Sequence, residues 1–482
     1  MSKFKRISIK FLASVIFLAC SLQAYSQDKA QKIDELANKY YSLGQLNGAV
    51  LVAEDGKIIY NKGFGMSDFE NKIPNNENTK FRLASVTKQF TATLIMQLVE
   101  KGKIKLEGKL TDYLPYYRKD VGDKITISQI LSHTAGIANY TNDSKFMMEQ
   151  TGTKVTPKEF VLKYCSEDLI FEPGTKWEYS NSGFFILGMV IEEVTGKTYE
   201  ENLEANILKP LGMTNTGYEH SDKTYENKAK GYVSTFGEFQ PARFLEMTIP
   251  YSAGSMYSTT GDMFIWDQAL YTEKILTKAS LDKMFTPVLN NYGYGWQIIE
   301  APLGDMKKKV ITHSGGIFGF NSLETRLVED NKYIMVFNNF ESGSINPITF
   351  GIVNILYGME PANPVKSAAM EFSRLIKEKG IDPAIEEFSK IKENKTEYKV
   401  SEREMNQLGY ILLQDGKTQE AVKVFKLNVD IYPESANVYD SYAEALAAAG
   451  DKENAIINYK KSIELNPDNI SGKEMLMKLE GK

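Results

Sequence analysis

The chain is organised around one segment, Phe81-Arg82-Leu83-Ala84-Ser85-Val86-Thr87-Lys88-Gln89-Phe90, which continues into Thr91-Ala92-Thr93-Leu94-Ile95-Met96-Gln97-Leu98-Val99-Glu100. Apolar residues after Ser85 recur at helical spacing and predict one buried stripe, made by Phe90, Leu94, Leu98 and Val99. We therefore expect Ser85 at or near the start of a helix, with Lys88 one turn later on the same side.

Ser85 and Lys88 have the chemistry of a nucleophile and its base. Free amide groups at a helix start stabilise an oxyanion, and a lysine partly removed from water can accept the serine proton. The spacing alone is not specific, because a capping serine followed by a solvated lysine gives the same pattern. Ser-x-x-Lys begins at five positions in this chain: Ser2, Ser26, Ser85, Ser280 and Ser389.

The composition limits the classes of function. With 482 residues, of which 42% are hydrophobic, the chain can bury one large core and is long enough for two domains. A formal charge of −5 shows no basic bias, so we expect no nucleic acid partner. The three histidines, His133, His220 and His313, form no ligand-spaced cluster with cysteines or acids. We therefore expect no metal and no other cofactor.

The N-terminus predicts a secretory signal peptide over residues 1–26. A basic start precedes the apolar run from Phe11 to Leu22, and Ala24-Tyr25-Ser26 suits cleavage before Gln27. The run is too short for a permanent anchor, so we expect a secreted or periplasmic protein with no transmembrane segment after signal removal. A lipid anchor at Cys20 is the weaker alternative, because Phe17-Leu18-Ala19-Cys20 resembles a lipobox only loosely. Loss of Cys20 leaves Cys165 without a disulfide partner.

Strand patterns lie near both ends of the first 340 residues. Gly48 to Ala53 and Lys57 to Tyr60 are joined by Glu54-Asp55-Gly56, which is typical of a hairpin turn. Further strands are predicted at residues 295–299, 310–312, 321–327 and 333–337. Helical patches, such as residues 125–131 and 184–194, lie between them. This order predicts one antiparallel sheet formed by both ends and flanked by helices.

The composition changes near Met359-Glu360-Pro361-Ala362-Asn363-Pro364, and the rest is helical. The tail repeats every 34 residues in the manner of tetratricopeptide repeats. The matching pairs are Gly416 and Gly450, Ala421 and Ala455, Phe425 and Tyr459, and Pro433 and Pro467, and a looser copy surrounds Gly380, Ala384 and Phe388. Stacked helix pairs of this kind either bind a protein partner or only cap the first domain.

Two further motifs contain the groups that a serine-lysine pair needs. Tyr179-Ser180-Asn181 lies on a loop before the predicted helix at Phe184 and offers a phenol for proton transfer. His313-Ser314-Gly315-Gly316 follows the predicted strand at residues 310–312. Its glycines allow a close approach of the backbone to a ligand, and a strand edge there can point an amide at a substrate carbonyl.

Together the motifs resemble those of the serine beta-lactamase and penicillin-binding-protein superfamily, and are most similar to the class C beta-lactamase-like serine hydrolases. The resemblance covers roughly residues 30–355 and rests on Ser85-x-x-Lys88, Tyr179-Ser180-Asn181 and His313-Ser314-Gly315 in that order. Supporting phrases are Leu131 to Ile137, Pro173-Gly174 and Ala253 to Asp262.

The resemblance implies a beta-lactamase-like α/β (α+β) fold, with an antiparallel sheet flanked by helices and a helical subdomain. We expect this serine hydrolase domain over residues 27–358, followed by a linker and an all-α tetratricopeptide-repeat domain over residues 359–482. The repeats are a possible site for a protein partner, and the substrate would be a small molecule or peptide.

The resemblance also implies roles for individual residues. Ser85 would be the acylated nucleophile, and Lys88 and Tyr179 would share the acid-base work, with the identity of the base left open. Asn181 would orient Lys88 and the substrate amide. The oxyanion would be held by the amides of Ser85 and Gly316, next to His313 and Gly315. His133 belongs to a family phrase and is interpreted as structural.

One departure from the family limits the substrate. True class C beta-lactamases and most transpeptidases have Lys-Thr-Gly as the third motif, and this sequence contains no Lys-Thr-Gly. His-x-Gly is similar to the esterase and D-aminopeptidase branches. We therefore expect an exported serine hydrolase that forms a covalent acyl-enzyme on an ester, amide or peptide. The alternatives are a D-alanyl carboxypeptidase or beta-lactamase, and a non-catalytic scaffold that binds a muropeptide or protein.

Overall fold

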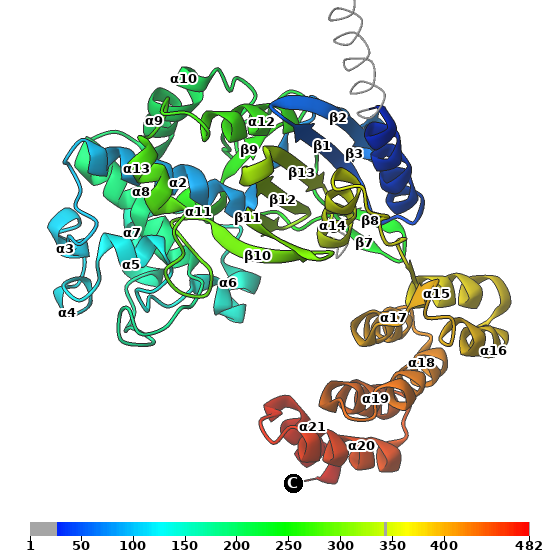
Figure 1. The fold of residues 1–482 in the computed structure, drawn as a ribbon. Helices are drawn as coiled ribbons and strands as arrows, with labels where there is room; N and C mark the ends of the chain where they lie inside the picture. Colours follow the sequence, from blue (N-terminus) through cyan, green and yellow to red (C-terminus); the bar gives the residue numbers. More distant parts are fainter. Residues whose placement is uncertain (1–26, 342–344, 482) are drawn as a thin grey trace, which may run out of the picture. The chain divides into compact units, whose positions relative to one another are not determined.

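The computed structural model describes residues 27–341 and 345–481. They divide into two compact units, one ending at Asn363 and one beginning at Pro364 (Figure 1). The predicted signal peptide, with Cys20, lies outside the described residues. In the part of the chain that is described, no helix has the length and apolar character needed to cross a membrane.

The described part of the first unit is built on an antiparallel sheet of six strands in the order β10-β11-β12-β13-β1-β2. β1 pairs with β13, with Val50 opposite Val336, so strands from both ends of the unit lie side by side as predicted. Asp55 and Gly56 have φ of 52° and 70° and form the predicted hairpin turn. The strands are β1 (Gly48–Glu54), β2 (Lys57–Phe64), β10 (Gln297–Leu303), β11 (Met306–Ile317), β12 (Phe320–Leu327) and β13 (Lys332–Asn338).

Helices cover both faces of this sheet, and the alternation of side chains along the strands separates two cores. Val50 and Val52 face the helix at residues 27–42 and α14 (Ile345–Leu356). Ala49 and Leu51 face the larger core that contains α2 (Thr87–Glu100), α8 (Asn181–Thr195) and α12 (Thr260–Ala269). Figure 1 shows the helical region beside the sheet, on the side of α2 and α8.

The helical region supplies most of the polar residues that surround Ser85. Its helices are α2 (Thr87–Glu100), α3 (Leu110–Tyr113), α4 (Lys119–Gly122), α5 (Ile127–Leu131), α6 (Ser144–Glu149), α7 (Pro157–Tyr164), α8 (Asn181–Thr195), α9 (Tyr199–Leu203), α10 (Lys209–Leu211), α11 (Tyr251–Gly254), α12 (Thr260–Ala269) and α13 (Lys278–Met284). Short helical turns are η1 (Ala84–Val86), η2 (Tyr140–Asn142), η3 (Glu204–Leu208) and η4 (Val328–Asp330). Short strands are β3 (Met66–Asp68), β4 (Ile73–Pro74), β5 (Phe81–Arg82), β6 (Gly217–Tyr218), β7 (Tyr232–Thr235), β8 (Glu238–Pro241) and β9 (Met256–Ser258).

The structure corrects three details of the sequence interpretation. The predicted single stripe on α2 is too narrow, because every residue from Thr87 to Leu98 is buried. The helix predicted from Phe184 begins at Asn181, since the Ser180 hydroxyl accepts a hydrogen bond from the Gly183 amide and caps it. The third motif does not follow a strand: β11 continues through it to Ile317.

The described residues of the second unit form helix pairs and a last helix. The elements are β14 (Lys366–Ser367), α15 (Ala368–Lys379), α16 (Ile381–Ile391), β15 (Tyr398–Lys399), α17 (Glu402–Gln414), α18 (Thr418–Ile431), α19 (Ala436–Ala448), α20 (Lys452–Leu465) and α21 (Ile470–Glu480). Gly416 and Gly450 both adopt positive φ at the turn inside a pair. Phe425 and Tyr459 are buried at equivalent positions, so the 34-residue period corresponds to one helix pair.

Candidate active site

Ser85 lies on the turn η1, at the junction between β5 and α2. Ala84 has a φ of 49°, a left-handed conformation that costs a non-glycine residue about 1–3 kcal/mol. Neighbouring elements hold the turn in place: the Leu83 amide donates to the Met256 carbonyl at 2.8 Å, and the Ser322 hydroxyl donates to the Leu83 carbonyl at 2.7 Å. Ser85 is half-buried and Lys88 is fully buried beneath it.

Lys88 is surrounded by oxygen atoms and has no carboxylate partner among the described residues. Its Nζ lies 2.7 Å from Asn181 Oδ1, 2.8 Å from the Ala253 carbonyl oxygen and 3.0 Å from Ser85 Oγ. Burial holds the pKa of Lys88 well below its usual value, which favours the neutral amine. A neutral amine has two N–H donors, which match the two carbonyl oxygens. In the neutral state the lone pair is left for the Ser85 hydroxyl, whereas an ammonium would donate to Ser85 Oγ as well.

Tyr179 lies on the loop before α8, and its side chain lies close to Ser85 and Lys88. Burial raises the pKa of its phenol, and a hydrogen-bond interaction with Ser85 lowers it in part, so the phenol stays protonated at neutral pH. Lys88 Nζ is 4.9 Å from the centre of the tyrosine ring. His133 holds this loop: its Nδ1 accepts from the Ser180 amide at 3.1 Å, and its carbonyl accepts from the Glu178 amide at 3.0 Å.

Asn181 is the first residue of α8, and its side chain is fixed at both ends. Its Oδ1 contacts Lys88, and its Nδ2 donates to Thr141 Oγ1 at 3.1 Å. The backbone amide of Asn181 donates to Asn139 Oδ1 at 3.1 Å. The structure thus brings Asn181 into contact with Lys88, as the sequence predicts.

His313 lies on β11, and both of its ring nitrogens have protein partners. Nδ1 is 2.6 Å from the Ser314 carbonyl oxygen, which only accepts, so this nitrogen has the proton. Nε2 then accepts from the Tyr292 hydroxyl at 2.8 Å. Burial, helped by nearby Lys88, lowers the pKa of His313 to about 3. The ring therefore forms a neutral wall of the site, and neither nitrogen is left to bind a substrate carboxylate.

Gly315 and Gly316 lie in different surroundings, Gly315 against η1 and Gly316 at the surface of the site. A Cβ at Gly315 would lie 2.3 Å from the Leu83 carbonyl oxygen, so this glycine lets β11 pack directly against η1 and leaves no room there for a ligand. The sequence interpretation assigned the close approach at these glycines to a substrate, and at Gly315 the close neighbour in the structure is η1. Gly316 is exposed and lines the site together with Ser85. Its amide and that of Ser85 are the two donors expected for the oxyanion.

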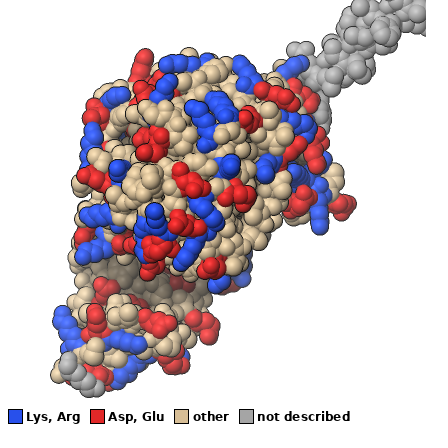
Figure 2. Space-filling model, turned by 90° about the vertical axis from the view of Figure 1, so that its left-hand side faces the viewer, with Lys and Arg blue, Asp and Glu red and all other residues tan. Residues whose placement is uncertain are grey.

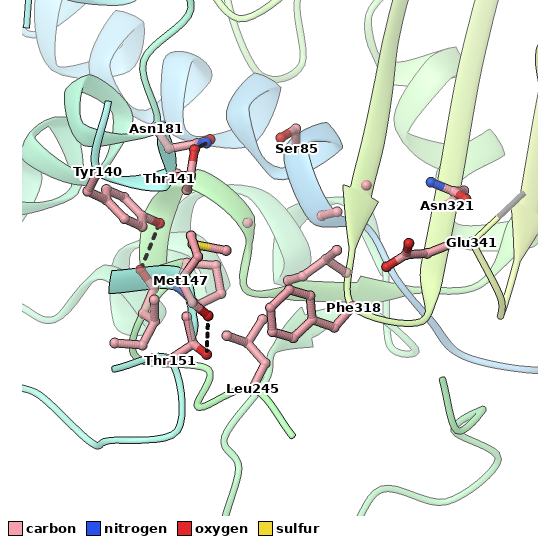
Figure 3. Close-up of a pocket in the computed structure, with 17 residues that line it drawn as sticks. Ser85, Tyr140, Thr141, Met147, Thr151, Asn181, Leu245, Phe318, Asn321 and Glu341 are labelled. Atoms are coloured by element: carbon pink, nitrogen blue, oxygen red, sulfur yellow. Dashed lines mark hydrogen bonds between the residues drawn. The ribbon is translucent and has the colours of Figure 1, made fainter. Parts of the chain in front are cut away.

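Ser85 and Gly316 lie on the boundary between two pockets. The larger, of about 400 Å³, is bordered by η1, α6, α11 and the end of β11, and Figure 3 shows Ser85 and Asn181 at one side of it. The smaller, of about 300 Å³, is lined by Tyr179, His313 and four further residues besides Ser85 and Gly316: Trp177, Tyr292, Gln297 and Ser314. The pairing of β10 with β11 ends at Thr312, so one side of β11 from His313 onward faces this pocket.

Three groups at the site were missed by sequence reasoning. Thr141 supports Asn181, Tyr292 supports His313, and the Ala253 carbonyl accepts from Lys88. Ala253 begins one of the phrases that support the family resemblance, so a signal was present for it. Thr141 and Tyr292 lie on loops with no distinctive pattern, and only the fold brings them to the motifs.

Comparisons with known proteins agree with this geometry. The family model for beta-lactamase matches residues 31–343, and the model for a tetratricopeptide repeat matches residues 436–469. The chain is 30% identical over 383 residues to penicillin-binding protein 4* of Bacillus subtilis (strain 168), which covers 74% of this chain and 82% of that protein.

Two solved structures are also similar. A penicillin-binding protein from Bacillus halodurans superposes with a TM-score of 0.58 at 26% identity. The match covers 67% of this chain and 97% of the chain of that protein. A D-stereospecific amidohydrolase from Streptomyces has a TM-score of 0.57 at 27% identity, with the same coverage.

The fold and the Ser-Lys-Tyr site define a serine hydrolase. The chain belongs to the beta-lactamase family and ends in a tetratricopeptide-repeat region. Within the described residues, no group of three or more histidines, cysteines or acids is arranged to hold a metal ion. On the face in Figure 2, basic and acidic side chains are interspersed without a large area of one sign.

Proposed function

We propose that the protein is an exported hydrolase that cleaves an ester, amide or peptide through an acyl-enzyme on Ser85, and that it prefers an uncharged leaving group. The contacts of Lys88 carry this proposal. A buried neutral amine whose two N–H groups are taken by Asn181 and Ala253 presents its lone pair to the Ser85 hydroxyl. This arrangement favours Lys88 over Tyr179 as the base of the acylation step.

The proposed reaction has two halves. Lys88 takes the proton from Ser85 Oγ as Oγ bonds to the substrate carbonyl carbon, and the amides of Ser85 and Gly316 hold the resulting oxyanion. The tetrahedral intermediate expels the leaving group, which takes the proton back from Lys88 through the Tyr179 hydroxyl. Water then gives a proton to Lys88 by the same route as it attacks the acyl-enzyme, and Lys88 returns that proton to Ser85 Oγ as the acid is released.

The pocket that Tyr179 lines supports the preference for an uncharged leaving group. The smaller pocket, which Tyr179 lines, has no lysine or arginine among its described lining residues, and His313 is neutral there. A D-alanyl carboxypeptidase or a beta-lactamase must hold a carboxylate on its substrate, and this pocket offers no cation for it. We therefore prefer an ester or amide without a carboxylate on its leaving group as the substrate.

The repeat region and the N-terminus support two further parts of the proposal. Tetratricopeptide repeats offer a surface for a protein partner, and we assign that role to the second unit. The predicted signal peptide supports a secreted or periplasmic location, which secretion of the full chain from a bacterial host and N-terminal sequencing of the product would test.

A fluorophosphonate probe tests the proposed chemistry. We expect covalent labelling of the mature protein and none of Ser85→Ala. Ser389→Ala is the matched control, because Ser389 begins another Ser-x-x-Lys on the exposed surface of α16 and should be labelled like the unchanged protein. Labelling of Ser85→Ala, or of neither protein, would refute the assignment of the nucleophile.

A further inference from the structure

The two pockets beside Ser85 receive different parts of a substrate, given the proposed function. The group that returns a proton to the leaving atom must reach that atom, and Tyr179 lines the smaller pocket. The leaving group therefore occupies the smaller pocket. The acyl group, on the other side of the carbonyl carbon, occupies the larger pocket.

The larger pocket combines apolar walls with one charge. Tyr140, Met147, Leu245, Ile249, Ile317 and Phe318 supply apolar surface. Of the described residues that line this pocket, Glu341 alone has an ionisable carboxyl, and none is a lysine or arginine. Figure 3 shows the Glu341 carboxylate turned toward the interior of the pocket, beside Phe318.

The sheet register explains how Glu341 comes to the pocket. Asn338, at the end of β13, lies opposite Asn321 near the start of β12, so the residues after β13 continue past the pocket wall formed by β11 and β12. No lysine or arginine of the described chain forms an ion pair with Glu341. Arg243 does not line the pocket but contacts its wall: it donates to the Met147 carbonyl, and to the Met148 carbonyl and Thr151 Oγ1 at 3.1 Å each, and lies 4.7 Å from the Phe318 ring centre. Its donors are thus directed at the protein and not at Glu341.

We propose that Glu341 is a specificity-determining residue that selects acyl groups bearing an ammonium group. Glu341 is exposed at the edge of the pocket, so it attracts a cation as a surface carboxylate does, while the apolar walls hold the acyl chain and bring its ammonium end to the carboxylate. The same carboxylate disfavours acyl groups that bear an anion. The substrates singled out in this way are amides or esters whose acyl part has an apolar body and a free amine.

Paired substrates that differ only at the amine test this proposal. Suitable probes are the p-nitroanilides of D-alanine, L-alanine and 6-aminohexanoic acid, each compared with its N-acetyl derivative. Each is measured by turnover and by its ability to slow fluorophosphonate labelling of Ser85. The second measurement detects binding even for an amide that is cleaved slowly.

We expect the unchanged protein to favour at least one free amine over its N-acetyl partner by about 2- to 5-fold. This ratio should fall to about one in Glu341→Gln, drop below one in Glu341→Lys and recover in part in Glu341→Asp. The matched control is Glu226→Gln, an exposed glutamate away from both pockets, which should keep the original ratio.

Two results would overturn the proposal: a ratio near one for every pair in the unchanged protein, or an unchanged ratio in Glu341→Gln. Both leave the proposed function intact as long as the fluorophosphonate labels Ser85. Loss of labelling in the unchanged protein is instead a failure of the proposed function, so the two failures are distinguishable.

Discussion

Replacement of Gly315 by alanine should separate the two elements that form the oxyanion site. The new Cβ would lie 2.3 Å from the Leu83 carbonyl oxygen, 2.4 Å from Ser322 Oγ and 3.1 Å from Ala84 Cβ. Ordinary carbon–oxygen contacts are about 3.3 Å or longer, so β11 and η1 must move apart by about 1 Å. The bond from Ser322 to Leu83 ties the two elements together at this point and resists that movement.

The consequences for rate and stability can be estimated separately. A displacement of about 1 Å between the amides of Ser85 and Gly316 should lower kcat about 100-fold, because both donors must meet one oxyanion. Overpacking of the buried contact should lower the free energy of unfolding by about 1–3 kcal/mol. The first quantity is measured from the turnover of a chromogenic ester with an acylation burst, and the second from urea unfolding.

Gly261→Ala is the matched control for this experiment. Gly261 lies in α12, its nearest atom to an added Cβ is Thr259 Oγ1 at 4.0 Å, and its φ is not left-handed. This variant should keep kcat within about twofold, since alanine is favoured in a helix. A folded Gly315→Ala protein with unchanged kcat would refute the reasoning about the oxyanion site.

Four other results are expected. Lys88→Arg should lower kcat/KM by about 10²- to 10⁴-fold, because a guanidinium stays protonated and cannot act as base; an unchanged rate of fluorophosphonate labelling would contradict this. In a pH–rate profile, kcat/KM should fall as pH falls through the lowered pKa of Lys88, because the base must be neutral. Titration of Lys88 should cause no change in kcat/KM near pH 10, where an ordinary lysine titrates. The pKa of His313 is lowered to about 3 in the folded protein, against an ordinary value of 6.5. Between these two pH values the unfolded chain binds a proton at His313 that the folded chain does not. At pH 4.5 this lowers the free energy of unfolding by about 3 kcal/mol relative to pH 7. In His313→Gln, urea unfolding should show a smaller loss of stability between pH 7 and pH 4.5. A chain ending at Asn363 should remain folded and active on a small ester, and insolubility would show instead that the repeats cap the first unit.

Local sequence patterns were sufficient for much of the fold. The Asp55-Gly56 turn, the strand pattern near both ends and the 34-residue period are short-range signals, and the structure contains the elements that they predict. The order of Ser85-x-x-Lys88, Tyr179-Ser180-Asn181 and His313-Ser314-Gly315 also led to the right family. These features depend on residues close together in the chain, which is why they can be recognised without the structure.

The chemistry of the site depended on contacts between distant segments. The spacing of Ser85 and Lys88 is repeated four more times in the chain, and what distinguishes this pair is the burial of the amine against Asn181 and Ala253. The same holds for His313, whose partner Tyr292 makes it a neutral wall.

The sequence by itself determined the family, the antiparallel sheet and the three motifs that include Ser85, Tyr179 and His313. Only the tertiary structure decided which groups are neutral, which glycine packs against η1 and which pocket contains the Glu341 carboxylate. The physical reason is that desolvation and close packing depend on every atom around a group. Those atoms come from segments that the sequence does not place next to one another.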